Sequence, residues 1–448
     1  RQMCIRDRCT VIYKNPNILL GNIDDQFYWV VNPYIKNGLK IINSSQYSIL
    51  TAIRGASAIS EISETTKFSF DEILQVYDVL KSKDIVNSTN EFTPPLWSSD
   101  ITSLHLWIHT TNECNLRCSY CYIHTLGKRD YIKPETIQKI CDSICSTVET
   151  RHLQSVYLRF AGGEPLLKIQ LWKDAIINLK NRLNTINCEL HIAFLTNLVK
   201  LEDDTLNFLV QSKSHISVSL DGLGHFQDQT RHYSSGKGTS DIVLVNIQKL
   251  LLNGIKPTIM TVVSNSNMDG LIELTKFAIK NNLYLRYSFV HGEEINKQKL
   301  SKTLYSCYDV YQKAILAGFS FAKLHKLCDL KLLAPFYQNC SNGLNGGAIY
   351  TNGAVFFCHK EFGLESALGH LDENLDLITV IQKGKYKNII SKECNSCNLV
   401  YVCNGGCQSV RIHGKDPYCD IYREIIPIIY RLIALERLEM IKHSININ

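Results

Sequence analysis

The stretch TNECNLRCSYCY (residues 111–122) decides how this sequence is interpreted. Its three cysteines, Cys114, Cys118 and Cys121, have the spacing C-x3-C-x2-C and follow a β-strand predicted over 104–110. A short loop can bring three thiols to one place, and thiolates are the ligands that hold iron–sulfur clusters. A four-iron cluster held by three cysteines leaves one iron open to a small molecule. A structural zinc site, or a chance cluster in a cysteine-rich chain, is the alternative.

This spacing and its position after a strand resemble the radical S-adenosylmethionine (radical SAM) superfamily. The resemblance implies that the amino and carboxylate groups of SAM chelate the open iron. It also implies that reduction of the cluster cleaves SAM to a 5′-deoxyadenosyl radical, which abstracts hydrogen. Tyr122 follows the third cysteine, the position whose aromatic ring usually lies against adenine in this superfamily.

Composition limits the class of protein. The chain has 448 residues, 45% of them hydrophobic and 20% charged, which is enough for two or three globular domains. A net charge of +6 is too small to indicate nucleic-acid binding. No apolar run is long enough to span a membrane. Because the 17 cysteines form tight clusters and no signal peptide is evident, we expect metal ligands in a reducing cytoplasm rather than disulfides.

Strands and helices alternate over 104–305, which predicts parallel pairing through right-handed crossovers. Six strands give an α/β fold with a partial (β/α)6 barrel, whose active residues should lie at the carboxyl ends of the strands. The predicted strands span 104–110, 155–161, 189–196, 215–220, 256–263 and 284–290. The predicted helices span 134–149, 169–183, 203–211, 240–252 and 268–281.

Two further motifs follow predicted strands. Gly162 and Gly163 allow close backbone approach to a ligand, and Glu164 can accept from an ammonium group. By resemblance they match the radical SAM motif that binds the SAM amino group, although such a motif is more often a plain turn. Ser219 and Arg231 match residues that contact the SAM ribose and carboxylate. Their alternatives are a turn hydroxyl and a solvated charge.

Residues 27–87 read as a small winged-helix-like module of strands and three short helices, the last of which is capped by Ser69. Ser44 or Ser45 is expected to cap the first. The module resembles the RiPP recognition element, which binds leader peptides of ribosomally made, modified peptides by strand addition. A DNA-binding winged helix or a packing domain is the alternative, but the helix after Ser69 is not basic. We treat residues 1–26 as a terminal segment that is partly artefactual, and we give Cys4 and Cys9 no role. We treat residues 88–103, which contain Pro94-Pro95, as a linker.

A helical bridge is predicted over 306–335 and is clearest over 311–333. Seven cysteines then recur over 336–430. A C-terminal helix and tail are predicted over 431–448. Their intervals resemble the SPASM domain, which implies two auxiliary four-iron clusters. The ligands of the second would be Cys394, Cys397, Cys403 and Cys419. The first would take Cys340, Cys358 and Cys407, with Cys328 completing it or with one iron open to substrate. Cys141, Cys145, Cys188 and Cys307 fit buried positions instead.

His359 stands where sulfatase maturases of this kind have a catalytic aspartate. A histidine can take a proton, but an ordinary loop position is an equal interpretation.

The sequence thus predicts a radical SAM/SPASM maturase with SAM and three [4Fe–4S] clusters, acting on a precursor peptide with a leader. A thioether or carbon–carbon cross-link is the expected product, and a flavodoxin or ferredoxin is the expected reductant. The alternatives are a protein-modifying maturase of the anaerobic sulfatase or quinohaemoprotein type, and a cluster-carrying electron-transfer or peptide-binding protein without radical chemistry.

Overall fold

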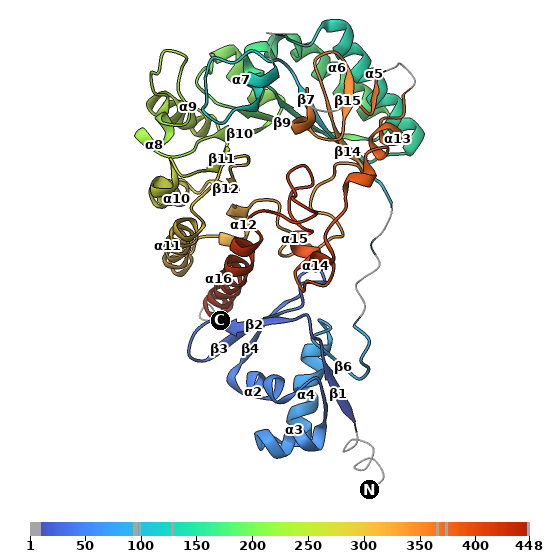
Figure 1. Cartoon of the computed structure of the whole chain (residues 1–448), viewed down its shortest axis with the longest axis vertical. Helices are drawn as coiled ribbons and strands as arrows, with labels where there is room; N and C mark the ends of the chain where they lie inside the picture. The colour runs from blue at the N-terminus through green and yellow to red at the C-terminus, as the bar shows by residue number, and fades with distance from the viewer. Residues whose placement is uncertain are drawn as a thin grey trace.

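The computed structural model describes residues 10–92, 97, 100–126, 130–363, 367–371 and 375–445. The expectations for Cys4, Cys9 and Pro94-Pro95 therefore lie outside the described residues. Figure 1 shows the N-terminal module at one end of the long axis and the barrel at the other. Of the cysteine-rich C-terminal part, residues 392–403 lie between them, whereas residues 346–356 lie beside the barrel strands.

A parallel sheet with helical crossovers forms the barrel and confirms the predicted α/β class. Its six predicted strands lie side by side in chain order, so their carboxyl ends share one edge. They are β7 (Ser103–His109), β8 (Ser155–Ala161), β9 (Glu189–Thr196), β10 (His215–Ser219), β11 (Thr258–Val263) and β12 (Tyr284–Phe289). Alternating apolar residues made these strands predictable.

The sheet is wider than the six strands predicted. The described residues add β13 (His325–Leu327) parallel to β12 and β14 (Gly346–Ile349) parallel to β7. The short antiparallel strands β15 (Ala354–Phe356) and β16 (Gly369–His370) complete a ten-stranded order. The cysteine-rich part is thus joined to the barrel by main-chain hydrogen bonds.

Helices cover one face of this sheet. On β8, Val156, Leu158 and Phe160 are buried, whereas Tyr157 and Arg159 on the opposite face are exposed. Each buried apolar side chain of this size stabilises the fold by about 1.5–3 kcal/mol. The helices are α5 (Pro134–Arg151), η2 (Pro165–Leu171), α6 (Lys173–Thr185), α7 (Asp203–Gln211), α8 (His225–Asp228), α9 (Ser240–Leu252), η3 (Met268–Gly270) and α10 (Leu271–Lys280).

The N-terminal module contains two three-stranded sheets, β5-β1-β6 and β2-β3-β4. It starts before residue 27, because two of its strands lie in the part treated as a terminal segment. Ser69 caps α4 as predicted, but Asn43 rather than Ser44 or Ser45 caps α2. The elements are β1 (Val11–Lys14), β2 (Leu19–Asn22), β3 (Phe27–Val31), β4 (Leu39–Asn43), α2 (Ser44–Ala52), β5 (Ala56–Ala58), α3 (Ile59–Thr66), α4 (Phe70–Lys81) and β6 (Val86–Asn87).

The module is fixed to the rest of the chain by α16 (Cys419–Ile445). Trp29 on β3 stacks on Tyr430 of α16, with ring centroids 6.0 Å apart. Arg437 of α16 donates to the carbonyl oxygen of Leu39 at 3.2 Å. Val30, between these contacts, points to the module's own core. The β2-β3-β4 sheet is therefore shared between two cores.

Two predicted helical spans differ from the structure. The bridge is α11 (Lys297–Leu316) and α12 (Phe321–Leu324), followed by a strand rather than a helix to 333. Gly318, with a φ of 90°, ends the first helix in a conformation that favours glycine. The C-terminal helix begins at Cys419 and not at 431. The remaining elements are η1 (Tyr122–Leu126), η4 (His359–Glu361), α13 (Leu377–Gln382), η5 (Lys385–Lys387), α14 (Lys392–Asn395) and α15 (Val400–Cys403).

Candidate functional site

The loop that carries Cys114, Cys118 and Cys121 follows β7 at the carboxyl edge of the sheet. Burial, together with the charges of Glu164 and of the other two cysteines, raises the pKa of Cys114 to about 12. The three thiols thus lie within electrostatic reach of one another. No group of three histidine, cysteine or acidic residues among those described is spaced for a single metal ion. A cluster does not need such a group, because each thiolate binds a different iron.

Gly162 and Gly163 hold the cysteine loop by backbone contact. The amide of Gly163 donates to the carbonyl oxygen of Thr111 at 2.6 Å. A Cβ on Gly163 would lie 2.1 Å from the carbonyl oxygen of Glu113, and Gly162 has a φ of 134°. Neither position can carry a side chain without moving the loop.

Glu164 is buried, and its carboxylate ties two strand ends together. It accepts from the amides of Leu166 at 3.1 Å and Asn197 at 2.8 Å, and from the Thr196 hydroxyl at 2.7 Å. Burial raises the pKa of Glu164 to about 7 against these donors. The side chain is therefore engaged with protein, rather than presented to a ligand as the sequence suggested.

Asn197, to which the sequence gave no role, lies against the cysteine loop. Its Nδ2 donates to Asn115 Oδ1 at 2.8 Å and lies 3.6 Å from Cys114 Sγ. Leu198 follows with a φ of 53°, in the left-handed region. Leucine at this position, where many superfamily members have glycine, costs about 1–2 kcal/mol of backbone strain.

Arg231 is buried and paired, not a solvated loop charge. Its Nε donates to Asp221 Oδ2 at 2.8 Å, and its Nη1 lies 4.0 Å from Cys118 Sγ. Asp221 also accepts from the Tyr120 hydroxyl and from the amide of Val262. The half-buried Ser219 hydroxyl, one turn away, has no hydrogen-bond partner in the described part of the chain.

Asp221 and Tyr120 contact the predicted site residues, and sequence reasoning gave neither a role. The available signal was a carboxylate directly after a buried strand, at the edge where active residues gather. The backbone supports the same arrangement, because the amide of Arg117 donates to the carbonyl oxygen of His232 at 2.8 Å. The segment bearing Arg231 is thereby joined to the cysteine loop.

His359 lies between the barrel and the cysteine loop. Its ring stacks on Trp107 at 3.9 Å and lies 5.8 Å from the ring of Tyr122. Burial, with the charges of Lys360 and other cations, lowers the pKa of His359 to about 3. The imidazole is therefore neutral and a weak base here. The Tyr122 hydroxyl is buried without a hydrogen-bond partner in the described residues.

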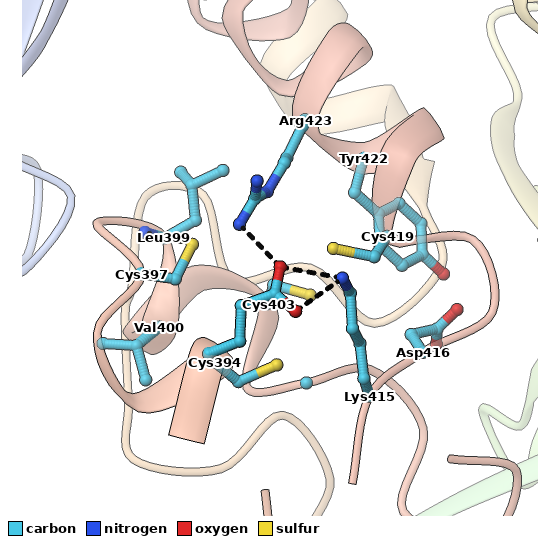
Figure 2. Close-up of a pocket in the computed structure, with 12 residues that line it drawn as sticks. Cys394, Cys397, Leu399, Val400, Cys403, Lys415, Asp416, Cys419, Tyr422 and Arg423 are labelled. Atoms are coloured by element: carbon cyan, nitrogen blue, oxygen red, sulfur yellow. Dashed lines mark hydrogen bonds and ion pairs between the residues drawn. The ribbon is translucent and has the colours of Figure 1, made fainter. Parts of the chain in front are cut away.

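The four cysteines Cys394, Cys397, Cys403 and Cys419 line one pocket, as Figure 2 shows. Glu393, Lys415 and Arg423 lie at the same pocket, with Lys415 Nζ 2.8 Å and Arg423 Nη2 3.4 Å from Glu393 Oε1. Glu393 and Cys394 lie on α14, Cys403 on α15, and Cys419 and Arg423 at the start of α16, whereas Cys397 and Lys415 lie in the connecting segments. This donor set fits a [4Fe–4S] cluster, which takes four thiolates.

Cys340, Cys358 and Cys407 form the other C-terminal group. Burial and the charge of Asp329 are the largest causes that raise the pKa of Cys340. The charges of Cys358 and Cys407 also raise it, so the three thiols are neighbours.

Besides burial, the groups that most strongly shift the pKa of Cys328 are Tyr422, Arg286, Asp416 and Asp329. Asp329 also raises the pKa of Cys340, so Cys328 and Cys340 lie near the same carboxyl group, and Cys328 as the fourth ligand stays a prediction. Cys141, Cys145, Cys188 and Cys307 are buried, as predicted.

Residues 108–278 match the Radical SAM superfamily. The chain therefore contains a radical SAM domain, whose cofactors are SAM and a [4Fe–4S] cluster. In sequence it is 24% identical over 325 residues to a cysteine-type anaerobic sulfatase-maturating enzyme of Clostridium novyi, covering 66% of this chain and 86% of that protein. It is 30% identical over 186 residues to a GTP 3′,8-cyclase of Clostridium perfringens, covering 41% of this chain and 54% of that protein.

Two solved structures share the fold. Native anSMEcpe with bound AdoMet and the Cp18Cys peptide has a TM-score of 0.62 at 20% identity, covering 75% of this chain and 99% of that one. Streptococcus suis SuiB bound to the precursor peptide SuiA has a TM-score of 0.54 at 15% identity, covering 91% and 99%. In the part of the chain that the structure describes, no helix has the length and apolar character needed to cross a membrane.

Proposed function

We propose that this protein is a radical SAM maturase that modifies a ribosomally made precursor peptide, forming a thioether or carbon–carbon cross-link. The observation that carries the proposal is the combination of a radical SAM domain with two further cysteine groups in the C-terminal part of the chain. The fold shared with anSMEcpe and SuiB, both solved with bound peptides, supports it.

In the barrel, Cys114, Cys118 and Cys121 would hold the first cluster. When bound, the cluster and SAM supply radical hydrogen abstraction. The Gly162–Gly163 backbone and Ser219 would bind SAM, and Arg231, already aligned by Asp221, would bind its carboxylate. Tyr122 would lie against its adenine. Glu164 and Asn197 would position the loop rather than touch SAM.

The C-terminal part would act as a SPASM domain with two auxiliary [4Fe–4S] clusters. One would take the four cysteines of the Figure 2 pocket. The other would take Cys340, Cys358 and Cys407, leaving an iron open to a substrate thiolate. A cytoplasmic flavodoxin or ferredoxin would supply the electron.

The N-terminal module would hold the leader peptide by strand addition to a sheet edge. The placement of Trp29 on α16 supports a fixed distance between the leader site and the barrel. Its limits in this proposal are 10–87, ahead of the linker over 88–103.

A protein-modifying maturase of the sulfatase type is the second candidate, favoured by the similarity to the Clostridium novyi protein over most of its length. Against it, His359 stands in place of the aspartate base, and its lowered pKa makes it a poor replacement.

The test uses anaerobically reconstituted protein with SAM, dithionite and the peptide encoded beside its gene. Mass spectrometry should detect loss of two hydrogens from the peptide, with 5′-deoxyadenosine released. Modification of a sulfatase-derived peptide alone would favour the second candidate. Peptide binding without SAM cleavage would indicate a cluster-carrying protein without radical chemistry.

A further inference from the structure

The open face of the barrel sheet carries a cluster of positive side chains. Arg159 on β8, Arg286 on β12 and Lys326 on β13 lie on the face opposite the helices, and Arg286 and Lys326 are register partners. Lys331 follows β13. Burial, together with the charges of Arg286, Lys331 and Arg159, lowers the pKa of Lys326 to about 8 against the opposing charge of Asp329. The four cations therefore act on one another directly.

These charges are poorly compensated. Asp329 pairs with Arg286 at 3.0 Å, which leaves four cations against one carboxylate, and the Cys340 thiol is the other acidic group that acts on Arg159. In the described part of the chain, the side chains of Arg159, Lys326 and Lys331 have no hydrogen-bond or ion-pair partner. The side chain of Arg159 is exposed, although burial of its surroundings lowers its pKa. Unpaired cations within protein are costly unless a ligand supplies the counter-charge.

Three aromatic rings lie beside these cations on the same sheet face. The ring of Tyr157 stacks between His105 at 4.5 Å and His191 at 4.3 Å, on the same sheet face as Arg159. Burial, with the charge of Arg159, lowers the pKa of His105 to about 4, so this ring is neutral. An anion that reaches this face would meet the stacked rings and the unpaired cations.

We propose that Arg159, Lys326, Lys331 and Arg286 bind a carboxylate of the peptide segment that is modified, an aspartate or glutamate side chain or the C-terminal carboxylate. This inference rests on the proposed function and adds the chemical class of substrate. A planar guanidinium suits a carboxylate, because it can donate two parallel hydrogen bonds.

In the experiment, random peptides from a display library are selected for binding to the reconstituted full-length protein in the presence of SAM. The peptides are joined to their coding RNA through their C-termini, so only side chains can supply the carboxylate. The test protein is the variant Arg159→Gln/Lys326→Gln, which leaves the Arg286–Asp329 pair in place. Lys313→Gln/Lys323→Gln, which removes two exposed lysines elsewhere, is the matched control.

The parent and the control should enrich aspartate and glutamate, and the test variant should not. A selected peptide should lose affinity about 10- to 100-fold when its acid is changed to the amide, or when the test variant replaces the parent. If no side-chain preference appears, but synthetic peptides with a free C-terminus bind the parent at least tenfold better than their amides, the C-terminal carboxylate is the ligand.

Four results would overturn the inference. Selected peptides without any preference for acidic side chains or a free C-terminal carboxylate would overturn the inference and leave the proposed function intact. Failure to enrich any peptide would overturn both the inference and the proposed function. An acidic preference retained by the test variant would place recognition elsewhere, for example in the N-terminal module. Loss of iron from the test variant would show that the cations serve the thiolates near Cys340.

Discussion

Replacing Arg231 with alanine tests how the barrel holds SAM. The guanidinium is buried, fixed by Asp221 at 2.8 Å, and would present its remaining donors to the SAM carboxylate. A hydrogen bond to a charged group contributes about 1.5–3 kcal/mol, so Arg231→Ala should weaken SAM binding about 10- to 150-fold. The measurement is the SAM dissociation constant of reconstituted protein by equilibrium dialysis under anaerobic conditions.

The substitution also leaves Asp221 buried without its cation, which is costly in itself. The double variant Asp221→Asn/Arg231→Ala removes both charges and keeps the size of the first side chain. We expect it to retain its iron and still bind SAM weakly. Equal SAM affinity in the parent and Arg231→Ala would refute the proposed contact. Loss of iron from the double variant would show that Arg231 mainly holds the cysteine loop, through its position near Cys118.

Three further predictions follow from other contacts. Replacing Cys114, Cys118 and Cys121 together with alanine should abolish SAM cleavage. The variant should keep about two-thirds of the iron, measured by iron and sulfide assay, because the C-terminal cluster ligands are separate residues. Loss of all iron would contradict this prediction. Leu198→Gly should relieve left-handed backbone strain of about 1–2 kcal/mol but lose a fully buried side chain that stabilises the fold by about 2–5 kcal/mol. The temperature of thermal unfolding should therefore fall. A higher unfolding temperature would show that the strain is the larger of the two effects. Removing residues 10–87 should leave SAM cleavage nearly intact while peptide modification collapses, because a bound leader raises the local concentration of the core peptide. Equal peptide modification by the truncated and full proteins would exclude substrate recruitment by the module. Lost SAM cleavage would indicate a structural role of the module through Trp29 and Tyr430.

Much of the barrel could be predicted because its elements have strong periodic patterns. β8, β9, α7 and α9 have the predicted limits, since each alternates or repeats apolar residues against the core. The added strands β14 to β16 were missed because they are short, and β14 contains two glycines. Their pairing depends on distant chain segments, which local patterns do not record.

The site could be predicted as a set of motifs but not as a set of contacts. The cysteine spacing and Gly162-Gly163 identify the loop and its neighbour in sequence. The engagement of Glu164 by three donors and the pairing of Asp221 with Arg231 depend on strands that meet only in the fold. The strain at Leu198 likewise depends on backbone geometry, although the departure from glycine was a visible signal.

The most direct test of the account is release of 5′-deoxyadenosine from SAM by the anaerobically reconstituted protein with a strong reductant. Chromatography should detect the product with the parent and not with the Cys114/Cys118/Cys121 alanine variant. Absorption typical of iron–sulfur clusters should accompany it. Zinc in place of iron, with no such absorption and no 5′-deoxyadenosine, would contradict the assignment of these cysteines to a radical SAM cluster.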